Sequence, residues 1–288
     1  MTVAPQAPSV GELIATLERW FEPRWAEPWD NVGLVVGDPL RPAASVHIAV
    51  DPTRAVAQEA VALGADLLVT HHPLWLDGIC VMTGEKGHAY RALEAARCAL
   101  YVAHTNADVA NPGVSDALAA ALGLVDTRPL PPAAPAEPAD ERTGPVRNLG
   151  ERPLGLGRVG TVPSPRSLRA FVAQVADALP ATAAGVRATG DPDCTVRTVA
   201  VAGGACLGLA EQAAAAGADV LVTSDAKHHR AQEAPLPVVD VPHWAGEWPW
   251  TAALAERLRQ SFPAAAVTVS ALVTDPWTLA AGATSGTV

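Results

Sequence analysis

The sequence predicts an α/β fold made of two related α/β lobes, each built on a largely parallel sheet. Short apolar runs alternate with Ala-rich helical stretches, which is typical of βαβ units. This alternation occurs twice, and one motif marks both copies: GADLLVT at residues 64–70 and GADVLVT at residues 217–223. With 288 residues, the chain is long enough for two lobes of ordinary domain size.

The expected elements follow one another in order along each copy. In the first copy we expect strands at residues 46–50 and 66–70 around a helix at 53–63, and in the second copy strands at 196–202 and 219–223 around a helix at 207–216. Outside the copies we expect strands at 99–103, 237–241 and 265–269, and helices at 91–96, 114–122 and 246–259. Gly123 follows one of these helices, and glycine commonly closes a helix because it adopts left-handed backbone angles.

The domain boundaries are predicted from a change in composition. Residues 129–150 are rich in Pro, Ala and charged side chains, which sustain neither a helix nor a strand, so we expect a linker there. The N-terminal lobe then comprises residues 1–128 and is completed by residues 230–288. The second lobe comprises residues 151–229.

Charge and hydropathy argue against several classes of protein. The formal net charge is -10 and no basic patch is evident, so nucleic acid is not an expected partner. Apolar runs are too short to span a bilayer, and residues 1–8 lack the features of a secretory signal, so we expect a cytoplasmic protein without a membrane span. The four cysteines form no C-x-x-C pair and are expected to be small buried hydrophobic residues.

Polar side chains cluster just after the predicted strands. Ligands of open parallel sheets bind beyond the carboxyl ends of the strands, so these residues are the candidates for a functional site. They are His71 and His72 after the strand at 66–70, His104 and Asp108 after 99–103, Asp225, Lys227, His228 and His229 after 219–223, and His243 and Glu247 after 237–241.

Five of these residues suit a two-metal centre: His71, His72, Asp108, His243 and Glu247. His243 and Glu247 are four residues apart at a helix start and therefore share one face. With Glu247 bridging, each ion has about three protein ligands and keeps positions open for water, as catalytic sites require. The mixture of nitrogen and oxygen donors suits two divalent ions of zinc, iron, manganese or cobalt.

Each piece also has a purely structural interpretation. A histidine doublet at a strand end can be a pair of hydrogen-bonded loop residues. The His243 and Glu247 pair can be a surface ion pair, and Asp108 can cap the turn before Gly113. The three pieces support a metal site only if they meet in one crevice.

Further residues are assigned roles around this crevice. His104, Asp225, His228 and His229 are candidates for proton transfer, since imidazole titrates near neutral pH. Lys227 either contacts a phosphate or pairs with Asp225. Asp30 is expected to support the ligands from behind, whereas Trp244, Trp248 and Trp250 either line a pocket for a flat substrate or serve as packing and interface anchors.

A glycine pattern at Gly155, Gly157 and Gly160 spells G-x-G-x-x-G. The dinucleotide fingerprint needs a strand before it and a helix after it. Here a Pro-rich stretch precedes the pattern and a strand-like run at residues 159–162 follows. We therefore do not expect a nucleotide to bind there.

Several motifs resemble one known family. They are WDNVGL at residues 29–34, VTHHPL at 69–74, AHTNAD at 103–108, GVSDALA at 113–119, SDAKHH at 224–229 and HWAGE at 243–247. In order and spacing they resemble the Nif-three-like dinuclear metal centre hexameric proteins, which are also called type 2 GTP cyclohydrolase I homologues. The match runs from about Gly11 to about Leu258.

The resemblance implies a Nif-three-like fold, a ring-shaped homohexamer, and two metal ions per chain facing an internal cavity. By position, the ligands of the family fall on the five residues named above, with His104 close by. Two departures stand out: Asn111 and Pro112 occupy positions where members often carry two glycines, and the stretch between the lobes is too short for the domain that some members insert there.

The expected function is a metal-dependent hydrolase that uses a metal-activated water on a nucleotide-like or phosphoester substrate. The alternative is a non-catalytic metal-binding regulator or assembly protein that acts through protein partners. A fold and a metal pair do not identify a substrate, so both remain open at the level of sequence.

Overall fold

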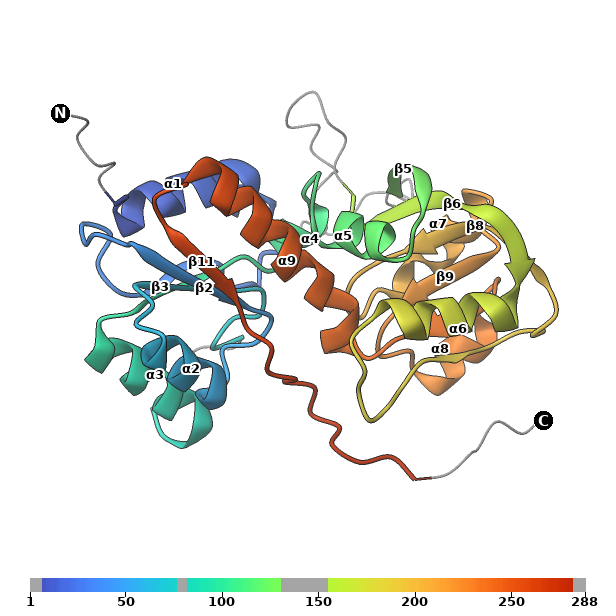
Figure 1. Ribbon diagram of the computed structural model, residues 1–288. Coiled ribbons are helices and arrows are strands. Elements are labelled where there is room, and N and C mark those ends of the chain that lie inside the picture. The colour runs from blue at the N-terminus through green and yellow to red at the C-terminus, as the bar shows by residue number, and fades with distance from the viewer. Residues whose placement is uncertain (1–6, 77–81, 131–154, 282–288) are drawn as a thin grey trace.

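The computed structural model describes residues 7–76, 82–130 and 155–281, and Figure 1 shows two lobes, each with its own sheet. The first sheet has the strand order β1 (Gly33–Val36), β4 (Ala99–Val102), β3 (Leu67–Thr70), β2 (Ser45–Ala49) and β11 (Ala266–Val269). Strands β4, β3, β2 and β11 run parallel, whereas β1 pairs antiparallel with β4 at one edge.

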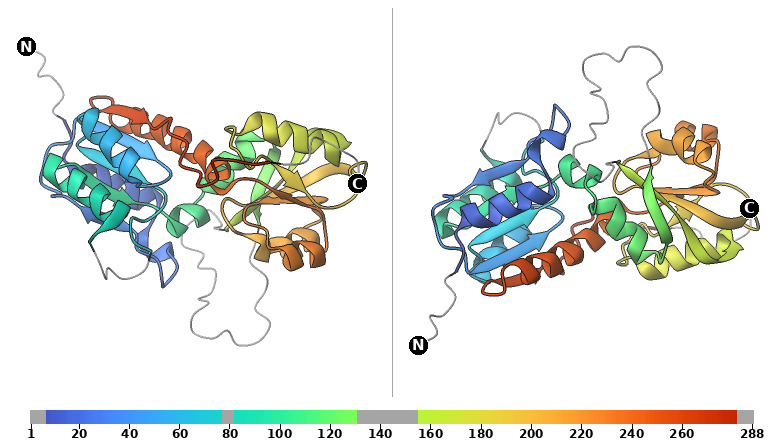
Figure 2. Two further views of the ribbon diagram at one scale, coloured as in Figure 1. Left: turned by 90° about the horizontal axis from the view of Figure 1, so that it is seen from below. Right: turned by 90° about the horizontal axis from the view of Figure 1, so that it is seen from above.

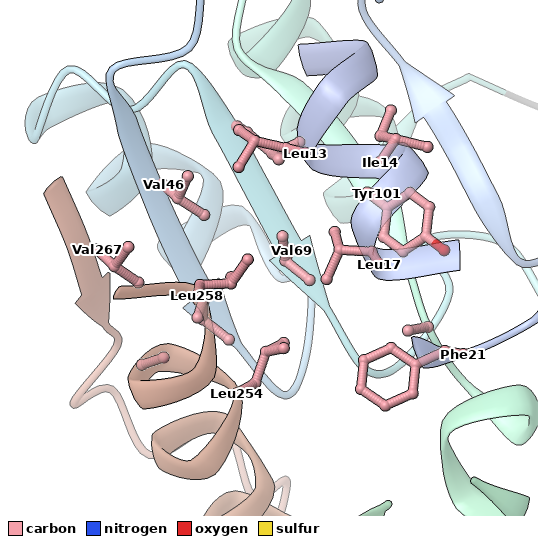
Figure 3. Close-up of a cluster of buried hydrophobic side chains, with 14 of the residues drawn as sticks. Leu13, Ile14, Leu17, Phe21, Val46, Val69, Tyr101, Leu254, Leu258 and Val267 are labelled. Carbon is pink, nitrogen blue, oxygen red and sulfur yellow. The ribbon is translucent and has the colours of Figure 1, made fainter. Parts of the chain in front are cut away.

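Helices cover both faces of the first sheet. Helices α1 (Val10–Trp20) and α9 (His243–Ser261) pack on one face, while α2 (Arg54–Ala62) and α3 (Gly84–Ala96) pack on the other (Figure 1). Figure 3 shows Leu13 and Leu17 of α1 and Leu254 of α9 meeting Val69 of β3 in one buried cluster. Helix α1 begins with a capping box, in which the Ser9 hydroxyl accepts from the backbone N–H of Glu12 at 3.2 Å.

The second sheet has the order β5 (Val125–Leu130), β6 (Gly157–Ser167), β8 (Thr195–Val201), β9 (Val220–Thr223), β10 (Val238–Asp240) and β7 (Arg187–Ala188). Helices α5 (Val114–Ala121) and α6 (Leu168–Ala178) pack on one face. The short helices η2 (Leu207–Leu209) and α7 (Ala210–Ala215) pack on the other.

The prediction of a two-lobed α/β protein is confirmed, with one difference in the second sheet. Only β8, β9 and β10 run parallel there, and the pairings of β5, β6 and β7 are antiparallel. The sequence repeat covers only β8, α7 and β9, where a helix between two strands leads to parallel pairing. The strands outside the repeat have no such constraint.

Sheet membership also differs from the predicted boundaries. Strands β5 and β10 belong to the second sheet, although residues 1–128 and 230–288 were assigned to the first lobe. Of the predicted linker at 129–150, Pro129 and Leu130 end β5, and the remainder lies outside the described residues. Gly157 and Gly160 lie within β6, in agreement with the strand expected after the glycine pattern.

The repeated GAD motif has one structural role in both lobes. Gly64 and Gly217 follow a helix with positive φ of 65° and 80°, which glycine adopts without steric strain. The Asp66 carboxylate then accepts two backbone N–H groups at the start of β2, at 2.8 and 3.1 Å. The Asp219 carboxylate accepts the backbone N–H groups of Arg197 and Thr198 within β8, at 2.8 Å each. In both lobes the motif therefore holds the backbone of the neighbouring strand.

Helix α9 joins the two lobes. Trp250, Leu254 and Leu258 from its later turns lie in the core of the first lobe. Trp244 and Ala245 from its first turn lie in the core of the second. The views from above and below in Figure 2 show the helix running from the side of the first lobe to the junction with the second. Among the described residues, every helix is too short or too polar to cross a lipid bilayer.

Candidate metal centre

The candidate site forms where strands of both lobes end. Strands β3 and β4 are parallel neighbours, so their carboxyl ends share one edge of the first sheet. His71 and His72 follow β3 directly. His104 follows β4 and precedes the short helix α4 (Thr105–Val109), which carries Asp108. Helix α9 begins at His243, shortly after β10 of the second sheet. The site therefore lies between the lobes.

The carboxylate of Glu247 is the centre of the cluster. Its Oε1 lies 2.9 Å from His243 Nε2 and 3.5 Å from His71 Nε2, and its Oε2 lies 3.0 Å from His72 Nε2. The fifth residue, Asp108, places its Oδ1 3.6 Å from His71 Nε2. The structure thus brings together all five residues that were predicted from the strand ends.

His104 also belongs to this cluster. The donor atoms of His71, His72 and His104 lie within 4.8 Å of one another, and so do those of His72, His243 and Glu247. Both triplets have a composition and spacing able to hold a metal ion. The rings of His71 and His72 are only 5.1 Å apart between centroids, so the doublet turns toward one crevice.

Each of the four histidines is held by its Nδ1 atom. The acceptors are the Ala103 carbonyl for His71 at 2.9 Å, Asp51 for His72 at 2.6 Å, Asp30 for His104 at 2.8 Å, and Asp225 for His243 at 2.6 Å. Because carboxylates and carbonyls only accept, Nδ1 carries the hydrogen in every case. Metal-binding histidines are commonly oriented in this way, with Nε2 left for the ion.

Three buried atoms of the cluster lack a hydrogen-bond partner within the described part of the chain: His71 Nε2, Asp108 Oδ1 and Glu247 Oε2. Leaving a buried polar atom unpaired costs roughly 1 to 3 kcal/mol, and more when it is charged. His71 Nε2 lies near both carboxylates, and all three atoms are donor types that a divalent transition metal accepts. The residues therefore fit a metal site.

The electrostatics of the cluster also favour a cation. Burial opposes the charged form of His243 most strongly, but the Glu247 and Asp225 carboxylates together outweigh it and raise the pKa of His243 to about 9. Burial is likewise outweighed at His72, whose pKa is raised well above its usual value. At Glu247 the burial penalty is overcome by the surrounding imidazoles, which hold its pKa well below the usual range. Without a cation, protons on the imidazoles balance this carboxylate.

The cluster opens into a cleft of about 1000 Å³. His72, His104 and His243 reach its surface, whereas His71 is fully buried behind them. The opposite walls come from the starts of α2 and α3 and from residues 274–277. The cleft gives a small molecule access to three of the candidate ligands.

The loop after β8 packs tightly against the cluster. Gly204 has a φ of 70°, and a Cβ placed on it would lie 2.9 Å from Glu247 Oε1 and 3.5 Å from His243 Nε2. Only glycine allows this close approach at the observed backbone angles. Gly204 follows the strand expected at 196–202, but it was not recognised from the sequence because the strand-end criterion considered only polar side chains.

The structure separates the other proton-transfer candidates. Asp225 borders the cleft, but its carboxylate receives the Nδ1–H of His243 instead of pairing with Lys227. His228 and His229 lie exposed on helix α8 (His228–Glu233), with ring centroids 5.1 Å apart. His228 lines a separate hollow, so neither histidine borders the crevice as expected. Strand β9 ends at Thr223, and the chain has turned away by residue 228.

The three tryptophans of α9 pack into the protein. Trp250 is buried in the first core, with its ring centroid 5.3 Å from that of His71. Trp244 is buried in the second core and borders the cleft. Trp248 packs against the second core, and its indole N–H donates to the Ser270 carbonyl at 3.4 Å. Packing is thus their main role, and only Trp244 can contact a ligand in the cleft.

Sequence reasoning anticipated one supporting carboxylate and missed another. Asp30 was expected behind the ligands, and it holds His104 through Oδ1 while its Oδ2 accepts from Thr105. These hydrogen bonds outweigh the burial penalty and lower the pKa of Asp30 to about 2. Asp51, which holds His72, was not considered. It follows the strand at 46–50 directly, so the strand-end criterion applied to that strand would have found it.

Comparison with known proteins shows the family of this chain. Residues 8–276 match the family model described as Duf34/NIF3 (NGG1p interacting factor 3). A Streptomyces coelicolor protein named GTP cyclohydrolase 1 type 2 homolog is 45% identical over 94% of both chains. One with the same name from Mycobacterium tuberculosis is 35% identical and is aligned over 94% of this chain and 97% of its own.

Among solved structures, a Bacillus cereus protein related to NIF3 superposes with a TM-score of 0.85 and 27% identity, covering 96% of this chain and all of that one. The fold, the extent of the family match and the identity to curated relatives agree. The chain belongs to the Duf34/NIF3 family.

Proposed function

We propose that this protein binds two divalent metal ions between its lobes and acts as a metal-dependent hydrolase. One observation carries the proposal: the Nε2 atoms of three histidines, each held from behind by a hydrogen bond, converge on the buried carboxylate of Glu247, and that of His71 also approaches Asp108. The residues that would hold the ions are His71, His72, Asp108, His243 and Glu247, with Glu247 shared and His104 beside them.

The spacing of the donor atoms supports this assignment. Zinc binds imidazole and carboxylate ligands at about 2.0 to 2.1 Å, so two ligands of one tetrahedral ion lie roughly 3.4 Å apart. His71 Nε2 lies 3.5 Å from Glu247 Oε1 and 3.6 Å from Asp108 Oδ1. His71 Nε2 therefore lies at the spacing of two ligands of one ion from each of the two carboxylates. The donor set suits zinc, iron, manganese or cobalt.

When bound, a pair of such ions lowers the pKa of a coordinated water and polarises the oxygen of a substrate, which is the chemistry of hydrolysis. The chain itself supplies orientation and proton transfer. His104 is the best placed acid–base group, because it borders the cleft and Asp30 fixes its Nδ1–H. Asp225 acts as a positioning group for His243, not as a proton-transfer group.

The substrate class that we propose is a nucleotide-like or phosphoester molecule. The curated relatives named GTP cyclohydrolase 1 type 2 homolog suggest a nucleotide, and the cleft of about 1000 Å³ is large enough for one. Arg54 and Lys86 border the same cleft and supply positive charge for a phosphate.

Elemental analysis of gently purified protein tests the metal, with His72→Ala as the site variant and the exposed His229→Ala as its control. We expect metal in the wild type and the control, and a reduced content in His72→Ala. A panel of nucleotides and phosphoesters then tests hydrolysis, with His104→Ala as the variant expected to lose turnover while keeping most of its metal. Metal-loaded protein that hydrolyses nothing would favour a metal-binding regulator or assembly protein.

The homohexamer and the cytoplasmic location expected from sequence are also part of the proposal. Light scattering on a size-exclusion column tests the first, and fractionation of the source cells tests the second.

A further inference from the structure

The segment after β11 forms one wall of the cleft. Residues 270–281 run without helix or strand from the first lobe along the junction (Figures 1 and 2). Ser270 anchors the start of the segment, because its hydroxyl donates to Glu59 at 2.5 Å and its carbonyl accepts from Trp248. Thr274, Asp275, Pro276 and Trp277 then border the cleft.

Thr274 reaches the metal cluster through Asp51. The Thr274 hydroxyl donates to Asp51 Oδ2, while Asp51 Oδ1 accepts the Nδ1–H of His72 at 2.6 Å. The carboxylate is therefore held at both oxygens. His72 in turn places its Nε2 3.0 Å from Glu247 Oε2. A change at Thr274 can thus alter the direction in which a candidate ligand points.

The same arrangement occurs a second time in the site. Asp30 accepts His104 Nδ1–H through Oδ1 at 2.8 Å and the hydroxyl of Thr105 through Oδ2 at 2.5 Å. In both cases a threonine fixes the carboxylate that fixes a histidine. The two cases differ in the part of the chain that supplies the threonine. Thr105 is the sequence neighbour of the histidine itself, whereas Thr274 comes from the C-terminal segment, 223 positions from Asp51.

We infer that Thr274 is a positioning residue for the metal centre, and that it fixes the Asp51 carboxylate so that His72 points at Glu247. The inference rests on the proposed metal-binding function. It assigns to the C-terminal segment a part in building the site, in addition to forming the wall of the cleft.

The test compares three variants of the full chain. Thr274→Val removes the hydroxyl and keeps the shape, and Thr274→Ser keeps the hydroxyl. Thr16→Val is the matched control, because the hydroxyl of this buried threonine in α1 donates to the Glu12 carbonyl at 3.1 Å and accepts from Arg19 at 2.7 Å, away from the segment after β11. Competition with a chelator measures Zn²⁺ affinity, and the visible spectrum of bound Co²⁺ reports the ligand geometry. Outer hydrogen-bond partners of metal ligands typically change affinity by about 10- to 100-fold.

We expect Thr274→Val to bind Zn²⁺ at least about 10-fold more weakly and to change the Co²⁺ spectrum, while Thr274→Ser and Thr16→Val resemble the wild type. Unchanged affinity in Thr274→Val would overturn the inference. Equal weakening in Thr274→Ser would overturn it too, because the hydroxyl would then be irrelevant, and equal weakening in Thr16→Val would overturn it because the location would be irrelevant.

A second measurement needs no metal. Crystal structures of the metal-free wild type and Thr274→Val are expected to show one conformation of Asp51 and His72 in the first and several, or a rotated carboxylate, in the second. Identical conformations would overturn the inference. If the wild type binds no metal, the proposed function fails, and these structures alone decide the role of Thr274.

Discussion

Replacing Gly204 with alanine tests whether the cluster around Glu247 is a metal site. The new Cβ would lie 2.9 Å from Glu247 Oε1, whereas carbon and oxygen normally approach to about 3.3 Å. The carboxylate or the loop must therefore shift by about 0.4 Å. Metal sites tolerate deviations of about 0.2 Å in ligand distances, so we expect at least a 10-fold loss of Zn²⁺ affinity, or about 1.4 kcal/mol.

The matched control is Gly217→Ala. Gly217 has a φ of 80° against 70° for Gly204, but no heavy atom lies within 4 Å of its added Cβ. Both variants should lose about 1 to 2 kcal/mol of unfolding free energy from left-handed backbone strain. Only Gly204→Ala should bind Zn²⁺ more weakly. Chelator competition measures the Zn²⁺ affinity, and urea unfolding in the presence of EDTA measures the unfolding free energy of both variants. Equal Zn²⁺ affinities of the two variants would refute the close packing of the loop against a metal site.

Two further predictions concern stability. Arg158 is fully buried and pairs with Asp116 at 2.6 Å, so Asp116→Ala leaves a buried charge without its counter-charge. We expect this variant to lose about 3 kcal/mol of unfolding free energy in urea. The control Asp193→Ala removes an exposed pair and should lose less than about 1 kcal/mol. A similar loss in both variants would contradict this. In metal-free protein, the Asp30 carboxyl has a pKa of about 2, below its unfolded value of about 3.9. The charged carboxylate therefore stabilises the fold at pH values above about 3.9, and this stabilisation is lost as the pH falls toward about 2. The unfolding free energies of wild type and Asp30→Asn should therefore differ by about 1 to 2 kcal/mol at pH 6 and converge near pH 2; a constant difference would argue against the assigned cause.

Much of the fold follows from local sequence patterns. The repeated GAD motif marks both strand–helix–strand units because the same glycine and aspartate perform the same backbone roles in each lobe. The antiparallel part of the second sheet leaves no comparable mark. Strand β6 pairs with β5 across residues 131–154, and pairing over such a separation depends on tertiary packing and not on local pattern.

The candidate site was predictable to the extent that its residues follow strand ends. The rule identified all five proposed ligands, since carboxyl ends of neighbouring parallel strands share an edge. The same rule included His228 and His229, because it cannot register a turn of the chain after Asp225. Thr274 lies outside any such rule, because it reaches the site from an extended segment that only the folded structure brings near Asp51.

Helix α9 limits how the site can move. Its first turn is buried in one lobe and its later turns in the other, and Glu247 lies between them. Pro249 interrupts the helix between these two parts, so any hinge motion of the lobes would have to bend the helix there or pull it out of a core. A chain cut into separate lobes would leave neither half with a complete set of ligands.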